Sequence, residues 1–520
     1  MARGNEDEGL GREHSPNANS SAALLDRLRR GDELGGRDRL SLVARLSLPA
    51  IMAQLSTTLM QYIDASMVGA LGATSSAAVG LVASSEWLIG WIATSAAVGF
   101  TVQVAQLVGA RRDADARGVL LQGIVCCAAV GAVLALIGTS LAPGLPAWLG
   151  GDPSVHPEAS AYFGNLCAGL PVTALLALTT GMLQASGDTL LPGLVNVLAC
   201  VLDAILDAIF IYPAGAAPVP APLAGLLGSA GLGLGWGVGG AALATVASSA
   251  IAVAVAAWAL LRRNDRLRLR PGDRLHLRRE TIACAARISV PVAIENSVFS
   301  GALVVTTKIV APLGAESIAA NSFATTAEGL CYMPGYGIGT AATTLVGQAI
   351  GAGRRDLARQ LAWLSVGIGV CVMVCGAGLM FAIAPQVIGL LTPVPGIRDL
   401  GARMLRIEAF AEPLYASAIV ASGCLRGAGD TLVSSALNFS SLWLVRIPLS
   451  MVLVGRLGLT GVWLAMAIEL CVRGCLFLTR LRGRAWSSRD LAGNMADTGD
   501  ADGAACDTTT PATEKGGEAE

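Results

Sequence analysis

The sequence carries little charge for its length. Charged residues make up 14% of the 520 positions, whereas soluble domains carry about 25%. This shortage excludes an assembly of soluble domains, because too few charged side chains remain to coat several globular surfaces. Histidine is also scarce, at 3 residues, and aromatic residues make up 5%. The chain has too few histidines for paired haem ligands or for a histidine metal cluster, so no metal site is predicted.

Apolar residues make up 53% of the chain, and its mean hydropathy is +0.61. Nearly uncharged runs of about 20 residues recur from Leu40 to Leu481, and each is long enough as a helix to cross ~30 Å of hydrocarbon. Twelve such runs lie near 45–70, 78–108, 119–143, 160–185, 190–212, 240–261, 287–313, 320–350, 362–391, 403–425, 432–455 and 461–482. The sequence therefore predicts an all-α integral membrane protein with twelve transmembrane helices.

The twelve cysteines fit neither a disulfide framework nor a metal site. None shows CxxC spacing. Cys371 and Cys375 lie four apart, on one face of a helix, but no histidine or carboxylate accompanies them at helical spacing. We interpret the cysteines of the apolar runs as small apolar side chains.

Arginine marks one side of the predicted membrane. It is concentrated in the N-terminal segment, the second loop, the stretch 262–286, the eighth loop and the C-terminal flank. The alternate loops without any Lys or Arg are 71–77, 144–159, 213–239 and 314–319. The positive-inside rule then places both termini in the cytoplasm, which requires an even number of spans. We expect a multi-pass protein of the cell's inner (plasma) membrane.

The chain also repeats itself at one constant offset, the separation of Pro49 from Pro291, which we call the repeat offset. The same offset relates Gln106 to Gln348, and Gly187–Thr189 to Gly429–Thr431. Each half holds six spans, and because six is even, both halves enter the membrane in the same orientation. This predicts two six-helix bundles related by a pseudo-twofold axis along the membrane normal.

The same patterns divide the chain into five parts. They are a cytoplasmic tail at 1–39, the first bundle at 40–261, a basic cytoplasmic linker at 262–286, the second bundle at 287–486 and a disordered cytoplasmic tail at 487–520.

Three aspartates are candidates for ion coupling. Asp64 lies on a span that rises from Arg45, and Asp207 lies almost equally far along a span that rises from Thr189. At ~1.5 Å per residue both reach a similar depth in the outer half of the membrane. Asp203 shares a helix face with Asp207. If the first and fifth spans are neighbours, the three carboxylates converge, and the group should hold a proton or bind a cation. The alternative is that they only hydrogen-bond to the backbone of a kinked helix.

Other charges within the spans are secondary candidates. Glu86 and Glu328 are related by the repeat, which suggests a common structural role. Glu295 lies in the seventh span, past Arg287, and could pair with Lys308 only if that span bends. Glu412 descends to about the depth that Arg446 reaches from the other side, so we expect an ion pair between them, with cation coordination as the alternative.

Several short sequence motifs resemble those of a known family. They are Asp64–Gly72, Val104–Ala110, Leu183–Thr189, Leu206–Ile211, Gly240–Thr245, Val346–Ala352, Leu425–Thr431, Trp443–Pro448 and Gly461–Trp463. In their order, spacing and duplication they resemble the multidrug and toxic compound extrusion (MATE) family, in its DinF/NorM-like range, over roughly residues 40–485.

The resemblance implies a secondary antiporter that exports organic, often cationic, drugs or metabolites in exchange for H⁺ or Na⁺, by alternating access between two bundles and without a cofactor. It matches Asp64 and Asp207 to acidic positions of the family. Asp203 stands where the family's word usually has Asn, and Tyr415 stands where some Na⁺-coupled relatives have Asp. Coupling is therefore expected to rest mainly on the first half.

Two alternatives compete with an exporter. A lipid-linked-precursor flippase of related fold would favour a basic central cavity, whereas the charges within the spans are mostly acidic. An intramembrane enzyme would need a nucleophile and base, or a metal, yet all three histidines lie outside the spans. We expect no enzyme activity, a small organic substrate, a lipid bilayer as surroundings, no nucleic acid as partner, and function as a monomer.

Overall fold

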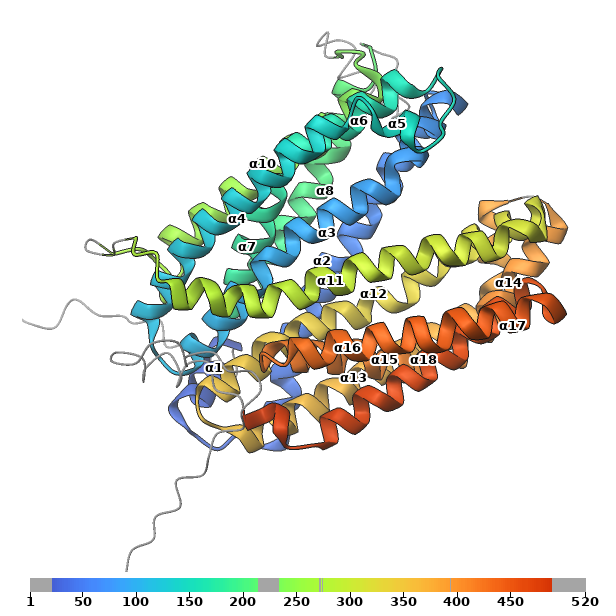
Figure 1. Ribbon diagram of the computed structural model, residues 1–520. Helices are drawn as coiled ribbons and strands as arrows, with labels where there is room; N and C mark the ends of the chain where they lie inside the picture. Colours follow the sequence, from blue (N-terminus) through green and yellow to red (C-terminus); the bar gives the residue numbers. More distant parts are fainter. Residues whose placement is uncertain (1–20, 214–232, 271–272, 274, 393, 489–520) are drawn as a thin grey trace, which may run out of the picture.

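The computed structural model describes residues 21–213, 233–270, 273, 275–392 and 394–488, and within them every regular element is a helix (Figure 1). An isolated bridge between Pro213 and Leu234 is the one strand-like pairing among these residues. The predicted all-α fold class is confirmed.

The first half begins with a short amphipathic helix and continues with the helices of one bundle. These elements are α1 (Ser21–Arg30), α2 (Gly36–Gly69), α3 (Ala73–Gly109), α4 (Asp113–Leu141), α5 (Leu145–Trp148), α6 (His156–Ala168), α7 (Leu170–Ser186), α8 (Leu190–Phe210) and α10 (Gly237–Arg262). Helices α6 and α7 are bent by 43° against each other. Pro171 lies at this break, where a proline can start a helix but cannot continue one.

The second half has the same plan with more interruptions. Its elements are α11 (Arg279–Val310), η1 (Ala311–Leu313), α12 (Ala315–Gly351), α13 (Arg355–Leu391), α14 (Pro395–Ala409), α15 (Glu412–Gly427), α16 (Thr431–Ser441), η2 (Leu442–Arg446), α17 (Ile447–Leu457), α18 (Leu459–Arg482) and η3 (Ala485–Ser488). Pro413 and Pro448 stand in the first turns of α15 and α17, so proline again marks a break.

Twelve membrane-crossing units can be traced through these elements. Nine of the described helices are each long and apolar enough to cross a membrane, and the bent pair α6 and α7 makes a tenth. Helix α12, with 37 residues, and the pair α14 and α15, with 15 and 16 residues, complete the twelve. The predicted multi-pass membrane protein with twelve helices in two bundles is what the structure shows.

The repeat is visible in the bounds of the helices. Helices α3 and α12 begin and end at positions separated by the repeat offset, and α4 and α13 begin with the same separation. Helices α10 and α18 begin closer together than this, because the connection between α8 and α10 is longer than that between α17 and α18. The two halves thus share one architecture and differ mainly in this connection.

Helices α3 and α12 cross where the two halves meet. The backbone of Gly109 on α3 lies against that of Gln348, and its repeat counterpart Gly351 on α12 lies against Gln106. A β-carbon on either glycine would overlap the facing backbone, so this close approach requires glycine. The exchange of partners between the halves is what a pseudo-twofold axis through the crossing produces.

Two glutamines beside the crossing bind the opposite half in a reciprocal way. Gln106 Nε2 donates a hydrogen bond of 3.2 Å to the carbonyl oxygen of Gly427 at the end of α15. Gln348 Nε2 donates one of 2.7 Å to the carbonyl oxygen of Ala185, near the end of α7. Each glutamine therefore joins its own half to a helix end of the other half.

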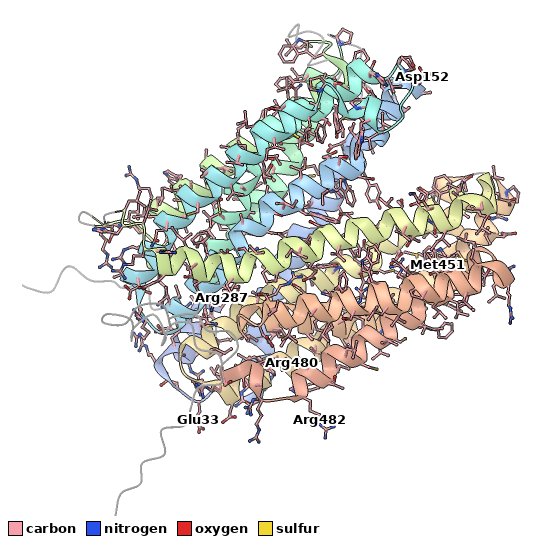
Figure 2. All side chains as sticks on the ribbon, in the orientation of Figure 1. Glu33, Asp152, Arg287, Met451, Arg480 and Arg482 are labelled. Carbon is pink, nitrogen blue, oxygen red and sulfur yellow. The ribbon has the colours of Figure 1, made fainter. Side chains whose placement is uncertain are left out.

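The two ends of the molecule differ in charge. Figure 2 labels Arg287, Arg480 and Arg482 near one end, and Asp152 near the other. We call the first the arginine-rich end, and it also carries α1. In Figure 1 the bundles lie close together at this end, and their ribbons diverge toward the end that carries α5 and α14.

Candidate functional site

Three aspartates from two helices meet inside the first bundle. Asp64 lies on α2, and Asp203 and Asp207 lie on α8, which packs against α2. One carboxylate oxygen from each of them lies within 4.8 Å of the others. The carboxyl group of Asp64 is within hydrogen-bonding reach of both partners. The predicted convergence of these three carboxylates is confirmed, and we call them the aspartate cluster.

The aspartate cluster is shielded from solvent and short of hydrogen-bond donors. Asp203 and Asp207 are fully buried, and Asp64 is partly exposed. Ser248 on α10 donates a hydrogen bond of 3.0 Å to Asp203 Oδ1. Within the described residues, no donor reaches either oxygen of Asp207, Oδ1 of Asp64 or Oδ2 of Asp203. Buried carboxylate oxygens without partners are costly, so this group is suited to take up protons or a cation.

Neighbouring groups hold the two helices of the cluster in place. The Tyr212 hydroxyl, just beyond α8, donates a hydrogen bond to the carbonyl oxygen of Met67 in the last turn of α2. Thr245, one turn before Ser248 on α10, lies within hydrogen-bonding reach of Asp203, and its hydroxyl donates a hydrogen bond of 3.2 Å to the carbonyl oxygen of Ala241. The cluster is therefore built from α2, α8 and α10, all within the first half.

A second acidic cluster lies in the other bundle. Glu328 of α12, Glu408 of α14 and Glu412 of α15 are buried and line a cavity of about 10 Å³, which is space for about one water molecule. The sequence expectations do not include Glu408. Its four-residue spacing from Glu412, the same as that between Asp203 and Asp207, is the signal that points to it.

The expected ion pair between Glu412 and Arg446 is wrong for the described structure. Glu412 Oε2 and Arg446 Nε have no hydrogen-bond partner. Arg446 Nη2 instead lies 2.8 Å from the sulfur of Met466 on α18. Arg446 ends the π-helical turn η2, and such a turn changes the direction of the side chains that follow a regular helix. The expected pair is based on the depth of the two residues alone, and that depth is counted along a regular α-helix.

Glu295 is held by groups of its own half. Its carboxylate forms an ion pair of 3.0 Å with Arg426, and it accepts hydrogen bonds of 2.7 Å from Ser435 and 2.6 Å from Asn438. These partners come from α15 and α16. A carboxylate with three donors is already satisfied, and this arrangement favours a role in packing α11 onto α15 and α16.

The repeat-related glutamates have different neighbours. Glu86 on α3 lies within hydrogen-bonding reach of Tyr162 on α6, whereas Glu328 lies within hydrogen-bonding reach of Glu408. The neighbour of Glu86 fits the proposed structural role. Glu328, its counterpart in the repeat, has a different neighbour.

Aromatic side chains lie where the halves face each other. The Tyr62 hydroxyl on α2 donates a hydrogen bond of 2.9 Å to the Thr326 carbonyl oxygen on α12. On the other side of the interface, the rings of Trp91 on α3 and Phe299 on α11 lie 5.9 Å apart. Tyr62 is exposed and stands two positions before Asp64. Both contacts join one half to the other.

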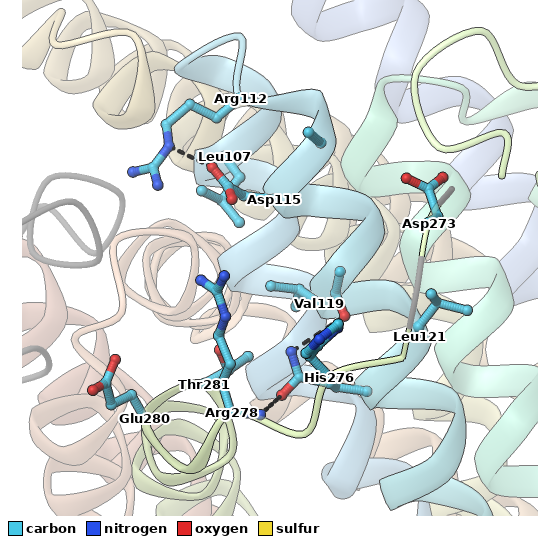
Figure 3. Close-up of a pocket in the computed structure, with 13 residues that line it drawn as sticks. Leu107, Arg112, Asp115, Val119, Leu121, Asp273, His276, Arg278, Glu280 and Thr281 are labelled. Carbon is cyan, nitrogen blue, oxygen red and sulfur yellow. Dashed lines mark hydrogen bonds and ion pairs between the residues drawn. The ribbon is translucent and has the colours of Figure 1, made fainter. Parts of the chain in front are cut away.

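A larger cavity of about 270 Å³ lies at the arginine-rich end, between the start of α4 and the segment before α11 (Figure 3). Its lining charges have both signs, and they include Arg112 and Asp115, which form an ion pair of 2.8 Å. None of the residues that line it belongs to the aspartate cluster. The cavity and the cluster are therefore separate features.

Known proteins are similar to this chain over most of its length. The MatE family model matches residues 49–209 and 291–452, two segments that begin at the repeat-related prolines. The probable multidrug resistance protein NorM of Thermotoga maritima is 27% identical over 458 residues, which are 86% of this chain and 92% of that protein. The multidrug resistance protein MdtK of Edwardsiella ictaluri is 24% identical over 460 residues, which are 86% of this chain and 95% of that protein.

Solved structures agree with the fold. The outward-facing conformation of a multidrug resistance MATE family transporter of the MOP superfamily superposes with a TM-score of 0.78 at 24% identity, and covers 88% of this chain and 98% of that chain. A crystal structure of MATE in complex with MaL6 gives a TM-score of 0.78 at 23% identity, with coverages of 88% and 97%. Because the family model matches more than half of the residues, in two segments that follow the internal repeat, this chain belongs to the MATE (MatE) family.

Proposed function

We propose that this protein is a secondary active antiporter that exports organic compounds, many of them cationic, in exchange for H⁺ or Na⁺. The observation that carries the proposal is the aspartate cluster, whose buried oxygens lack donors. Ionisable side chains inside a membrane mark ion pathways by default. The names of the relatives, multidrug resistance proteins, support drug export. No cofactor other than the coupling ion is proposed.

Ion binding at the aspartate cluster acts on the contact between the halves. A bound proton or Na⁺ removes part of the repulsion among the three carboxylates and so favours a tighter packing of α2 against α8. Helix α2 also packs against α12 of the other half. A change at Asp64 therefore reaches the interface through one continuous helix, and it shifts the balance between two arrangements of the halves.

The exported compound binds between the halves and leaves when the halves rock against each other. The aromatic side chains at this interface supply faces for cation–π contacts with organic cations. Tyr62 links ion binding to binding of the organic compound, because it lies on the same helix as Asp64 and faces the other half. The protein acts as a monomer, since one chain contains both halves.

The arginine-rich end faces the cytoplasm of a cell whose inner membrane holds the protein. Positive charge near membrane-spanning segments is retained on the cytoplasmic side. In intact cells, a membrane-impermeant thiol reagent should label a cysteine at Ser154, which is exposed at the opposite end. It should not label a cysteine at Arg268, exposed at the arginine-rich end, and the unsubstituted protein serves as background. The reverse pattern would show that the orientation is inverted.

The flippase alternative has less support. Binding of a pyrophosphate group between the bundles calls for a basic cavity, whereas the two charged clusters described above are acidic. No enzyme activity is proposed, because the matched relatives are transporters.

Transport in reconstituted vesicles tests the proposal and identifies the ion. With a fluorescent organic cation inside, an imposed gradient of the coupling ion should drive its release, and addition of the cation should speed decay of that gradient. We expect a response to H⁺ or to Na⁺ when each gradient is applied alone. Vesicles that respond to neither, although the protein is folded, would contradict antiport.

A further inference from the structure

The N-terminal helix α1 lies against the bundle at the arginine-rich end (Figure 1). Its apolar residues Leu24, Leu25 and Leu28 are buried in a cluster with residues of α2 in the first half and of α12 and α13 in the second half. Its opposite face carries charged residues. This amphipathic pattern has a buried partner in the structure, so α1 is packed as part of the fold.

One arginine of α1 joins the two halves. Arg29 Nη2 donates a hydrogen bond of 2.8 Å to the carbonyl oxygen of Ser186, at the end of α7 in the first half. The same nitrogen donates one of 3.0 Å to Gln348 Oε1, on α12 in the second half. Gln348 in turn donates to the carbonyl oxygen of Ala185. Arg29, Gln348 and the last turn of α7 therefore form one network across the interface.

The turn after α7 has the shape that this network needs. Gly187 adopts a left-handed conformation, with φ of +99°, and a β-carbon at this position would meet Leu25 and Arg29 of α1. The absence of a side chain thus leaves room for α1 at the interface. Gly187 belongs to the repeated Gly-Asp-Thr motif, and in this half the motif also contacts α1.

Burial of Arg29 makes the network sensitive to the loss of either partner. Only 8% of Arg29 is exposed. Desolvation, followed by the nearby charge of Arg266, lowers the pKa of Arg29 to about 9, so the guanidinium is still charged at neutral pH. A buried charge is tolerated only while hydrogen-bond acceptors surround it. Separation of Ser186 from Gln348 would remove one of the two.

Further contacts fix α1 to both sides. Arg354 Nη1, at the start of α13, donates a hydrogen bond of 2.6 Å to the carbonyl oxygen of Asp32, just after α1. Arg266, just after the first bundle, forms an ion pair of 3.4 Å with Asp26 of α1. The helix is therefore attached to both halves.

We propose that α1 is a latch that holds the two halves together at the arginine-rich end, with Arg29 as the group that closes it. The inference rests on the proposed alternating access, because a latch acts only if the halves separate at this end in another state. In that state Arg29 keeps contact with one half at most. The latch therefore favours the arrangement that is open toward the opposite end, and its release is a step of the cycle.

The experiment compares Arg29→Met with Arg30→Met in the full-length protein. Methionine keeps much of the aliphatic volume against Leu25 and removes the donors. Arg30 is the matched control, because it is the next residue of α1 and is exposed. Spin labels on ketone-bearing residues at Ala114 and Arg355, exposed positions of α4 and α13, report the distance between the halves without altering any cysteine.

Loss of charge-assisted hydrogen bonds should raise the ratio of long to short label distances by at least about tenfold in Arg29→Met. Arg30→Met should match the parent. Arg29→Lys, which keeps the charge but replaces the two donor nitrogens Nε and Nη2 with one, should lie between them. In one contrary outcome, the Arg29→Met protein folds and gives the same label distances as the parent, while a coupling ion still shifts the distances in the parent. That result would leave alternating access standing and overturn the latch. If no variant or ion yields the longer distance, alternating access fails with it.

Discussion

Asp64→Asn is expected to lower gradient-driven efflux severalfold or more while the protein still folds. Asparagine keeps the size of aspartate and its ability to form hydrogen bonds, but it cannot bind or release a proton and attracts Na⁺ less. Loss of the coupling free energy between ion and exported compound, typically about 1–3 kcal/mol, predicts efflux lowered by about 5- to 150-fold. The measurement is efflux of a fluorescent organic cation from cells that contain equal amounts of each variant.

Asp207→Asn should have the same effect, because its carboxylate belongs to the same cluster. The double variant should be little worse than either single one, since residues that serve one coupled step are not additive. Glu86→Gln is the control. Glu86 lies within hydrogen-bonding reach of Tyr162 on α6, which favours a structural role, so this substitution should lower the amount of folded protein more than it lowers coupling.

Two outcomes would contradict this assignment. Near-normal efflux by Asp64→Asn would show that this carboxylate does not couple ion entry to export. Loss of efflux confined to Glu295→Gln or Glu412→Gln would move the coupling site to the second half, where the second acidic cluster lies.

Arg473→Met is expected to cause the largest loss of stability. Arg473 and Glu469 are one turn apart on α18 and form a buried ion pair, with 2.7 Å between nitrogen and oxygen. The side chain of Glu469 is fully buried. Removal of the arginine leaves that carboxylate without its cation, which costs about 3–5 kcal/mol. Equilibrium unfolding of the purified protein in mixed micelles measures the change.

The controls for this prediction separate charge from volume. Arg482→Met, at the exposed end of the same helix, should change the free energy of unfolding little. The double variant Glu469→Gln with Arg473→Met should recover much of the loss, because no unpaired charge remains inside the bundle. A single variant Arg473→Met as stable as the parent would show that the pair contributes nothing.

Much of the fold could be predicted because its signals lie along the chain. The spans follow from the length of the apolar runs, and the two bundles from the repeat offset, which the bounds of α3 and α12 reproduce. The depth of Asp64 and Asp207 follows from counting residues along a helix of known rise. Their meeting needed one further condition, that the first and fifth spans be neighbours, and α2 and α8 satisfy it.

Other features depend on breaks that no residue count reveals. The π-helical turn η2 turns Arg446 toward Met466 and leaves the expected pair with Glu412 unmade. The spacing of Glu408 from Glu412 is visible in the sequence, but only the structure shows that both residues line one cavity with Glu328 of α12. Arg29 reads in the sequence as one more basic residue near the N-terminus, and in the structure it lies between the halves.

The sequence by itself determined the number of membrane-crossing helices, their repeat and how far along each helix the charges lie, because hydrophobic length and rise per residue act locally along each helix. Only the tertiary structure decided which charges are partners. Two side chains at equal depth meet only if their helices are neighbours and face each other. Those relations are set by packing between helices from distant parts of the chain, as at the crossing of Gly109 with Gln348.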